Sequence, residues 1–119
     1  VLGSLNLLEC LKGIDNVCSA VFITTDKVYK NKEWFYGYRE NDELGGRDPY
    51  SASKAAMEIA ISSYRESFCG DHSYQNPNLL IATARAGNVI GGGDWAKDRL
   101  VPDIVRSLFS KKKHSLKKS

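Results

Sequence analysis

Two short apolar runs separated by a long helical pattern constrain the fold of this chain most strongly. Residues 19–24 are centred on one continuous apolar run, and residues 79–84 form the other. Such runs are typical of strands buried on both faces of a parallel sheet. Residues 50–69 carry large apolar side chains at helical spacing, which predicts the longest helix of the chain. This alternation of strand and helix predicts an α/β fold with a parallel sheet.

Weaker patterns predict the remaining elements. Apolar residues at helical spacing predict a helix over residues 1–12, with Gly13 as its C-cap. Residues 25–49 are polar and aromatic and contain glycine, so they predict a long loop, which in a compact domain is usually functional. A last helix is expected to begin near Pro102. Its inward face would consist of Ile104, Val105 and Leu108.

A second stripe of small side chains runs along the helix predicted for residues 50–69. It consists of Ala52, Ala56 and Ala60. Two apolar stripes indicate burial on two sides, one against the sheet and one against a partner subunit. The pattern therefore predicts a homodimer that pairs through this helix.

The positive charge of the chain is concentrated at its end. The formal net charge is +3, but five of the 17 basic residues lie in positions 111–119, and without them 12 basic residues stand against 14 acidic ones. No basic stripe with interleaved aromatic residues crosses the body, so no nucleic-acid partner is expected. Residues 110–119 are of low complexity and predict a disordered or out-of-frame tail after a domain of residues 1–109.

The cysteines and the apolar runs bear on localisation. The three cysteines, Cys10, Cys18 and Cys69, fit no zinc spacing and are expected to be reduced thiols. No metal site is expected. No apolar run approaches the ~18–20 residues that span a membrane, and no signal peptide is recognisable. We therefore expect a cytoplasmic protein with no membrane partner.

Tyr50 and Lys54 are the candidate reactive pair. Four residues correspond to about one helical turn, so both side chains share a face of the predicted helix. An ammonium group near a phenol favours the phenolate and lowers the pKa of the tyrosine from about 10. Such a tyrosine can take a proton from a sugar hydroxyl. The same spacing also occurs in ordinary surface pairs, so the neighbouring segments must decide.

Two further polar segments follow the predicted strands. Thr24-Thr25-Asp26-Lys27 ends the first strand and is interpreted either as an active-site segment or as a helix N-cap or Asx turn. Residues 85–91 follow the second strand, where Gly87 permits close backbone approach and Asn88 can donate its amide to a phosphate oxygen. The glycine triplet at 91–93 matches neither the dinucleotide-binding pattern nor a P-loop, and it is interpreted as a turn.

In this order and spacing, the three segments resemble the extended short-chain dehydrogenase/reductase family. Thr25-Asp26-Lys27 resembles the Thr-Asp-Glu signature of nucleotide-sugar 4,6-dehydratases, with lysine in place of glutamate. Residues 31–50 and 84–100 are similar to CDP-glucose 4,6-dehydratases. The resemblance covers roughly residues 1–109. It implies the middle-to-late portion of a Rossmann-type, doubly wound parallel sheet that binds NAD and a nucleotide sugar.

The resemblance also implies a role for each site residue. Tyr50 would remove the proton of the 4-hydroxyl, Lys54 would lower the tyrosine pKa and bind the nicotinamide ribose, and Thr25 would position the 4-oxygen. Asp26 and Lys27 would eliminate water across C5–C6, and by analogy Lys27 is the base, although a neutral lysine beside Asp26 is unfavourable. Further contacts are implied for the substrate, through Asn88, Arg99 and Leu100, and for NAD, through Val89.

Two other interpretations remain open at this point. An NAD-dependent sugar-nucleotide epimerase would share Thr25, Tyr50 and Lys54 but would not need Asp26 and Lys27. A non-catalytic truncated fragment is the other, because the sequence contains no early glycine-rich turn for the NAD pyrophosphate. A chain of this length alone is therefore expected to bind NAD poorly.

Overall fold

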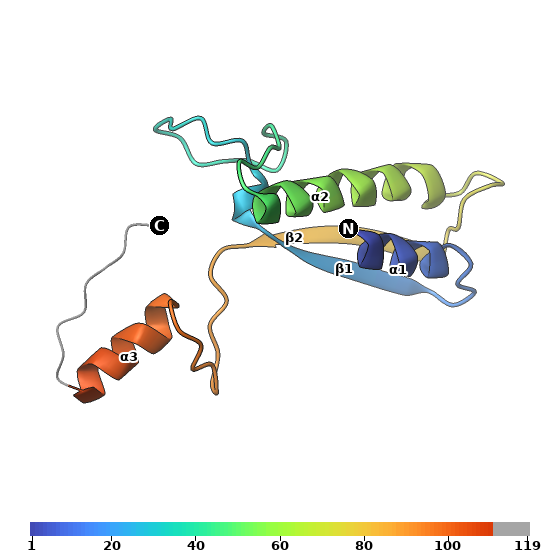
Figure 1. The fold of residues 1–119 in the computed structure, drawn as a ribbon. Coiled ribbons are helices and arrows are strands. Elements are labelled where there is room, and N and C mark those ends of the chain that lie inside the picture. Colours follow the sequence, from blue (N-terminus) through green and yellow to red (C-terminus); the bar gives the residue numbers. More distant parts are fainter. Residues whose placement is uncertain (111–119) are drawn as a thin grey trace. The chain divides into compact units, whose positions relative to one another are not determined.

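The computed structural model describes residues 1–110, which fall into two units (Figure 1). The first unit spans Val1–Gly87, and the second begins at Asn88. The first unit contains α1 (Leu2–Lys12), β1 (Cys18–Thr25), the 3-10 helix η1 (Asp26–Val28), α2 (Pro49–Phe68) and β2 (Leu79–Ala86). The second contains α3 (Leu100–Ser110). The predicted α/β order is confirmed, and the expectation for residues 111–119 lies outside the described residues.

The two strands form a parallel pair connected through α2. Cys18 lies opposite Leu79, and the register continues to Thr25, which lies opposite Ala86. Both strands are slightly longer than the apolar runs that predicted them, so Arg85 belongs to β2 and not to the loop after it. Because the strands run in the same direction and in register, their carboxyl ends lie side by side. The polar segments that follow them therefore start from the same edge of the sheet.

One face of the sheet carries the hydrophobic core. Both α1 and α2 cover this face, and the buried apolar side chains come from all four elements: Leu8, Phe22, Met57, Ile61, Leu79 and Ile81. Met57 and Ile61 are two of the large apolar residues at helical spacing that predicted this helix, and both belong to the core. Complete burial of a side chain such as Ile61 stabilises the fold by about 1.5–3 kcal/mol.

The opposite face of the strand pair is exposed within residues 1–110. Val21, Ile23 and Leu80 are each 58–60% exposed. The expectation that both strands are buried on both faces is therefore wrong for the described part of the chain. The physical reason is that successive strand residues point to opposite faces, while α1 and α2 both pack on the same one.

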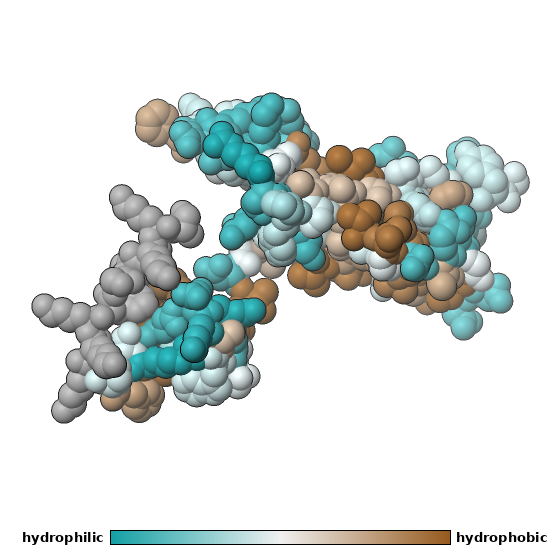
Figure 2. Space-filling view, in the orientation of Figure 1, coloured by the Kyte–Doolittle hydropathy of each residue, from teal (hydrophilic) through white to brown (hydrophobic). Residues whose placement is uncertain are grey.

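Two helices carry exposed apolar residues within residues 1–110. On α2, Ala52 and Ala56 of the small-residue stripe are exposed, so burial of this stripe against a partner subunit stays a prediction. In the second unit, α3 begins two residues before Pro102, which is buried. Of the three residues expected to face inward, Val105 is half-buried, whereas Ile104 and Leu108 are exposed. Apolar surface also lies over α1 (Figure 2), where the exposed residues include Leu2 and Leu7. Within residues 1–110, no helix combines the length and the hydropathy needed to cross a bilayer.

Candidate functional site

The candidate reactive pair lies in the first two turns of α2. Asp48 caps the helix, since its carboxylate accepts hydrogen bonds from the Ser51 backbone N–H at 3.0 Å and from the Ser51 hydroxyl at 2.7 Å. Pro49 occupies the first turn, where its missing N–H costs nothing. Tyr50 is 53% exposed, and the Lys54 Nζ lies 6.0 Å from the centroid of its ring. The predicted spacing thus places both groups at one end of α2.

The Asp48 cap gives a testable pH dependence. The hydrogen bond from the Ser51 backbone, followed by that from its hydroxyl, lowers the pKa of Asp48. The cap therefore stabilises α2 fully above the unfolded-state pKa of about 3.9, and this contribution is lost as the pH falls through the lower folded-state pKa. We expect Asp48→Ala to lower the Tm by about 5 °C at pH 7, and by less near pH 3. Thermal unfolding at both pH values checks this, with the exposed Asp71→Ala as control; an equal loss at both would contradict it.

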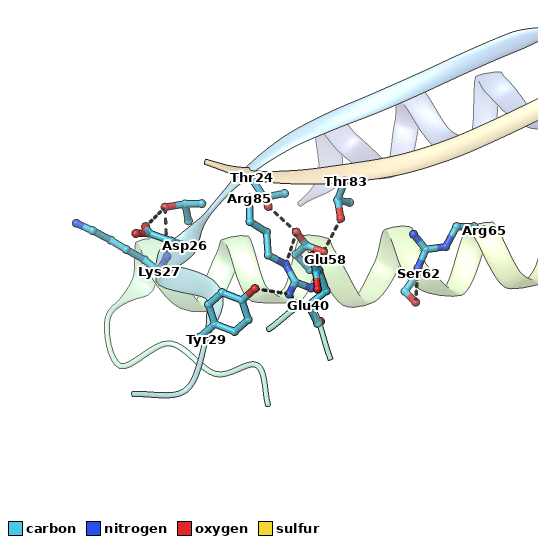
Figure 3. Close-up of polar contacts among 11 residues, drawn as sticks. Thr24, Asp26, Lys27, Tyr29, Glu40, Glu58, Ser62, Arg65, Thr83 and Arg85 are labelled. Atoms are coloured by element: carbon cyan, nitrogen blue, oxygen red, sulfur yellow. Dashed lines mark hydrogen bonds and ion pairs between the residues drawn. The ribbon is translucent and has the colours of Figure 1, made fainter. Parts of the chain in front are cut away.

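The end of β1 carries the second group of candidate residues. Thr25 is buried, and its Oγ1 accepts a hydrogen bond from the Lys27 backbone N–H at 3.3 Å. The Thr25 hydroxyl also lies 3.3 Å from Oδ1 of Asp26, to which it can donate. Asp26 and Lys27 are both exposed, and they lie next to each other at the start of η1 (Figure 3). The N-cap interpretation of Thr25 is therefore confirmed, and it leaves the two charged side chains accessible.

Backbone contacts bring these two groups of residues together. η1 contacts α2 directly. Gly46 lies against the first turn of α2, so closely that a Cβ added there would come within 3.0 Å of backbone atoms of Ser51 and Ala52. At the end of β2, a Cβ added to Gly87 would lie 3.7 Å from Oδ2 of Asp26. The two strand ends and the first turn of α2 therefore form one continuous region.

A buried ionic network lies behind this region. The Glu58 side chain is 4% exposed and forms an ion pair with Arg85, whose Nε lies 3.1 Å from Oε1. Glu58 also accepts hydrogen bonds from the hydroxyls of Thr24 and Thr83. Arg85 in turn donates to the Tyr29 hydroxyl at 3.0 Å (Figure 3). The network thus joins α2 to both strands and to the residue that follows η1.

The network keeps both of its charged members ionised. Burial alone raises the pKa of Glu58, but hydrogen bonds from Arg85, Thr24 and Thr83 outweigh it, so the pKa lies below its ordinary value. Burial alone lowers the pKa of Arg85, and its hydrogen bonds to Glu58 and Tyr29 reverse that effect. No side-chain nitrogen or oxygen that is buried within residues 1–110 lacks a hydrogen-bond partner.

Glu58 was not among the residues predicted for the site, although the sequence contains a signal for it. Glu58 lies between Met57 and Ile61 on the side of α2 that packs on the sheet. A carboxylate at a core-facing position needs a paired cation. Arg85, on the inward face of the strand run, is the complementary signal. The two signals indicate a buried carboxylate and a candidate cation, and the tertiary structure decides that they meet.

Other predicted residues lie outside this region of the first unit. Asn88, Val89, Arg99 and Leu100 belong to the second unit and are exposed there. Arg99 forms an ion pair with Asp94 at 3.1 Å. In the first unit, an open groove of about 850 Å³ lies beside the network, and its lining includes Glu58 and Arg85 but neither Tyr50 nor Lys54. Within residues 1–110, no cluster of His, Cys, Asp or Glu side chains could hold a metal ion.

Comparison with known proteins gives a family match. The sequence profile of the GDP-mannose 4,6-dehydratase family matches residues 1–76. The chain is 53% identical over 107 residues to CDP-glucose 4,6-dehydratase of Salmonella typhimurium, covering 90% of this chain and 30% of that protein. It is 28% identical to dTDP-D-glucose 4,6-dehydratase of Dictyostelium discoideum, covering 95% of this chain and 26% of that protein. The chain therefore spans about 30% of the length of these relatives or less.

A solved structure supports the fold. UDP-N-acetylglucosamine 4-epimerase from Methanobrevibacter ruminantium, in complex with UDP-N-acetylmuramic acid, superposes with a TM-score of 0.70. The superposition covers 94% of this chain and 34% of that protein, at 22% identity. At this identity the likeness concerns the fold. It confirms that the strands and helices form part of a Rossmann-type fold.

Proposed function

The chain belongs to the GDP-mannose 4,6-dehydratase family, and on this premise we propose that it supplies the catalytic residues of a nucleotide-sugar 4,6-dehydratase. The proposed substrate is CDP-glucose, and the product is its 4-keto-6-deoxy derivative. The 53% identity to a CDP-glucose 4,6-dehydratase supports this choice of substrate. The observation that carries the proposal is the contact of η1, with Asp26 and Lys27, against the helix that bears Tyr50 and Lys54. The activity is that of the whole protein to which these residues contribute.

NAD is the proposed cofactor, and the residues present fit it. Tyr50 is half exposed, and no carboxylate among residues 1–110 forms an ion pair with Lys54. The ammonium group is therefore available to a ribose hydroxyl, while the phenol remains accessible to a sugar. Tyr50 and Lys54 would hold the nicotinamide ribose, with Val89 as a further contact. NAD, when bound, would supply a hydride acceptor at C4 and return the hydride to C6.

Tyr50 would carry out the first proton transfer. Its phenolate would take the proton of the 4-hydroxyl as that carbon is oxidised to a ketone. Thr25 is buried at the end of β1, where its hydroxyl would orient the same oxygen. Lys54 lies one helical turn from Tyr50, with its Nζ 6.0 Å from the centroid of the tyrosine ring.

Asp26 and Lys27 would carry out the elimination of water across C5–C6. The new ketone acidifies the hydrogen at C5, so that one of these side chains can remove it as a proton. The other would protonate the departing 6-hydroxyl, which leaves as water. Both side chains are exposed beside Thr25, which supports a role for them at the same sugar. Lys27 is the proposed base, and Asp26 is the proposed acid.

Substrate contacts outside this region are proposed for the second unit. Asn88 would bind the diphosphate, and Arg99 with Leu100 would line the nucleotide site. The pairing of Arg99 with Asp94 supports a fixed orientation of its guanidinium group. Pairing of two subunits through α2 is proposed as well, supported by the exposed Ala52 and Ala56 on that helix.

Product analysis of the whole protein tests the proposed reaction. The protein would be incubated with CDP-glucose and NAD, and the sugar would be identified by NMR. We expect a 4-keto sugar with a methyl group at C5. An epimerised sugar that retains its 6-hydroxyl would instead support the 4-epimerase alternative, and unchanged substrate would contradict both.

Replacement of Lys27 separates the elimination from the oxidation. We expect Lys27→Ala to reduce formation of the 6-deoxy product by about 10²-fold or more, because the C5 proton loses its base. Oxidation at C4 should continue, so a 4-keto sugar that retains its 6-hydroxyl should accumulate in a single turnover. Lys30→Ala, an exposed lysine that pairs with Glu43, is the matched control. Formation of the 6-deoxy sugar at the wild-type rate would exclude Lys27 as the base.

A further inference from the structure

Glu58 connects three elements through one buried carboxylate. It accepts hydrogen bonds from Thr24 on β1 and from Thr83 on β2, the latter at 3.0 Å. It also receives two hydrogen bonds from Arg85, at 3.1 Å from Nε and 3.2 Å from Nη2. Figure 3 shows the carboxylate of Glu58 directed from α2 toward the strands, with Arg85 reaching back to it. Because each bond has a direction, the carboxylate defines both the distance and the rotation of α2 relative to the strands.

Each of these contacts lies next to a candidate site residue. Glu58 follows Lys54 by four residues and Tyr50 by eight, so the three occupy successive turns of α2. Thr24 directly precedes Thr25 in the chain. On β2, Arg85 lies two residues before Gly87, which faces Asp26. A shift of the Glu58 carboxylate would therefore displace Tyr50 and Lys54 relative to Thr25.

A second set of bonds extends the network to η1. The Nη1 of Arg85 donates to the Tyr29 hydroxyl at 3.0 Å and to the Glu40 carbonyl at 2.9 Å. Tyr29 is the C-cap residue that directly follows η1, the element that carries Asp26 and Lys27. Hydrogen bonds thus connect the ion pair to the residue that follows η1 as well as to both strands.

The free-energy cost of burying the Glu58–Arg85 ion pair favours a role for the pair in positioning α2. Removing two charges from water is expensive, and apolar side chains of similar volume often stabilise a core equally well. A fully hydrogen-bonded buried network supplies a defined orientation that apolar contacts do not. We infer that Glu58 is a positioning residue, which, through Arg85, Thr24 and Thr83, holds the Tyr50–Lys54 helix in register with Thr25. This inference rests on the proposed function for its catalytic consequence.

Replacement of Glu58 by glutamine tests the inference in the whole protein. Glutamine keeps the shape of the side chain but presents an N–H₂ group to a network of donors. We expect Glu58→Gln to lower kcat for 4,6-dehydration by about 10–100-fold, because small displacements of reacting groups are costly. The KM should change by less than about 3-fold, since the residue lies behind the site. Glu66→Gln, at an exposed glutamate of the same helix, should leave both constants unchanged.

A milder variant guards against loss of folding. Thr83→Val removes one hydrogen bond to Glu58 and preserves the side-chain shape. We expect kcat to fall by about 3–10-fold at a temperature where the protein remains folded. A purely structural role would lower the Tm of both variants but leave kcat of the folded protein unchanged. That result would overturn the inference.

A second measurement does not depend on turnover. In crystal structures of the wild-type and variant proteins, we expect the distance from the Tyr50 hydroxyl to the Thr25 hydroxyl to change by about 1 Å. An unchanged distance in Glu58→Gln and Thr83→Val would overturn the inference. A wild-type protein without dehydratase activity would instead overturn the proposed function, and the distance would still decide the role of Glu58.

Discussion

Replacing Tyr50 with phenylalanine is expected to lower formation of the 4-keto-6-deoxy sugar by about 10²–10⁴-fold, the range typical of a lost general base. Only the hydroxyl is removed, so the 4-hydroxyl of the sugar would lose its proton acceptor. The fold should not change, because Tyr50 is 53% exposed and its ring contact with Lys54 is preserved in phenylalanine. The expected change in the free energy of unfolding is within about 0.5 kcal/mol.

The measurement pairs turnover of the whole protein with its unfolding curve. Tyr74→Phe is the matched control, because Tyr74 is also exposed and lies in the loop before β2. Its turnover and stability should equal those of the wild-type protein. Unaltered turnover in Tyr50→Phe would exclude the phenol as the base, and a large loss of stability would show that the hydroxyl has a structural role instead.

The largest expected effect on stability comes from Gly46→Ala. The added methyl group would come within 3.0 Å of Ser51 and of the backbone nitrogen of Ala52, in the first turn of α2. Backbone atoms in a helix cannot move aside as a flexible side chain can, so either the loop or the helix must shift. We expect a loss of about 3 kcal/mol in the free energy of unfolding, at the upper end of typical overpacking. Turnover should also fall, because the displaced turn carries Tyr50.

Gly37→Ala is the control for this prediction. Gly37 belongs to the same long loop, and nothing lies within 4 Å of the position that its Cβ would take. Urea unfolding should therefore give the wild-type midpoint for Gly37→Ala and a much lower midpoint for Gly46→Ala. Equal midpoints for the two variants would show that the contact of Gly46 with α2 does not contribute to the stability of the fold.

Much of the local structure could be predicted from sequence patterns. The helical spacing of residues 1–12 and 50–69 predicted α1 and α2 to within one residue at each end, and the apolar runs predicted β1 and β2. Hydrophobic periodicity depends on residues close together in the chain, so it can be recognised without knowledge of the rest of the fold. The same patterns were wrong about the burial of Val21 and Ile23, because burial depends on which face the helices cover.

In the candidate site, too, some features follow from the sequence and others only from the tertiary structure. The sequence by itself determined that Tyr50 and Lys54 share one side of a helix and that Thr25 ends a strand, because both follow from spacing along the chain. Only the tertiary structure decided that Glu58 is a buried ion-pair partner and not a solvent-exposed helical glutamate. Its donors, Thr24, Thr83 and Arg85, come from strands 25–34 residues away in the chain. The physical reason is that a carboxylate is tolerated in a core only when such distant donors converge on it, and that convergence arises from the packing of α2 on the sheet.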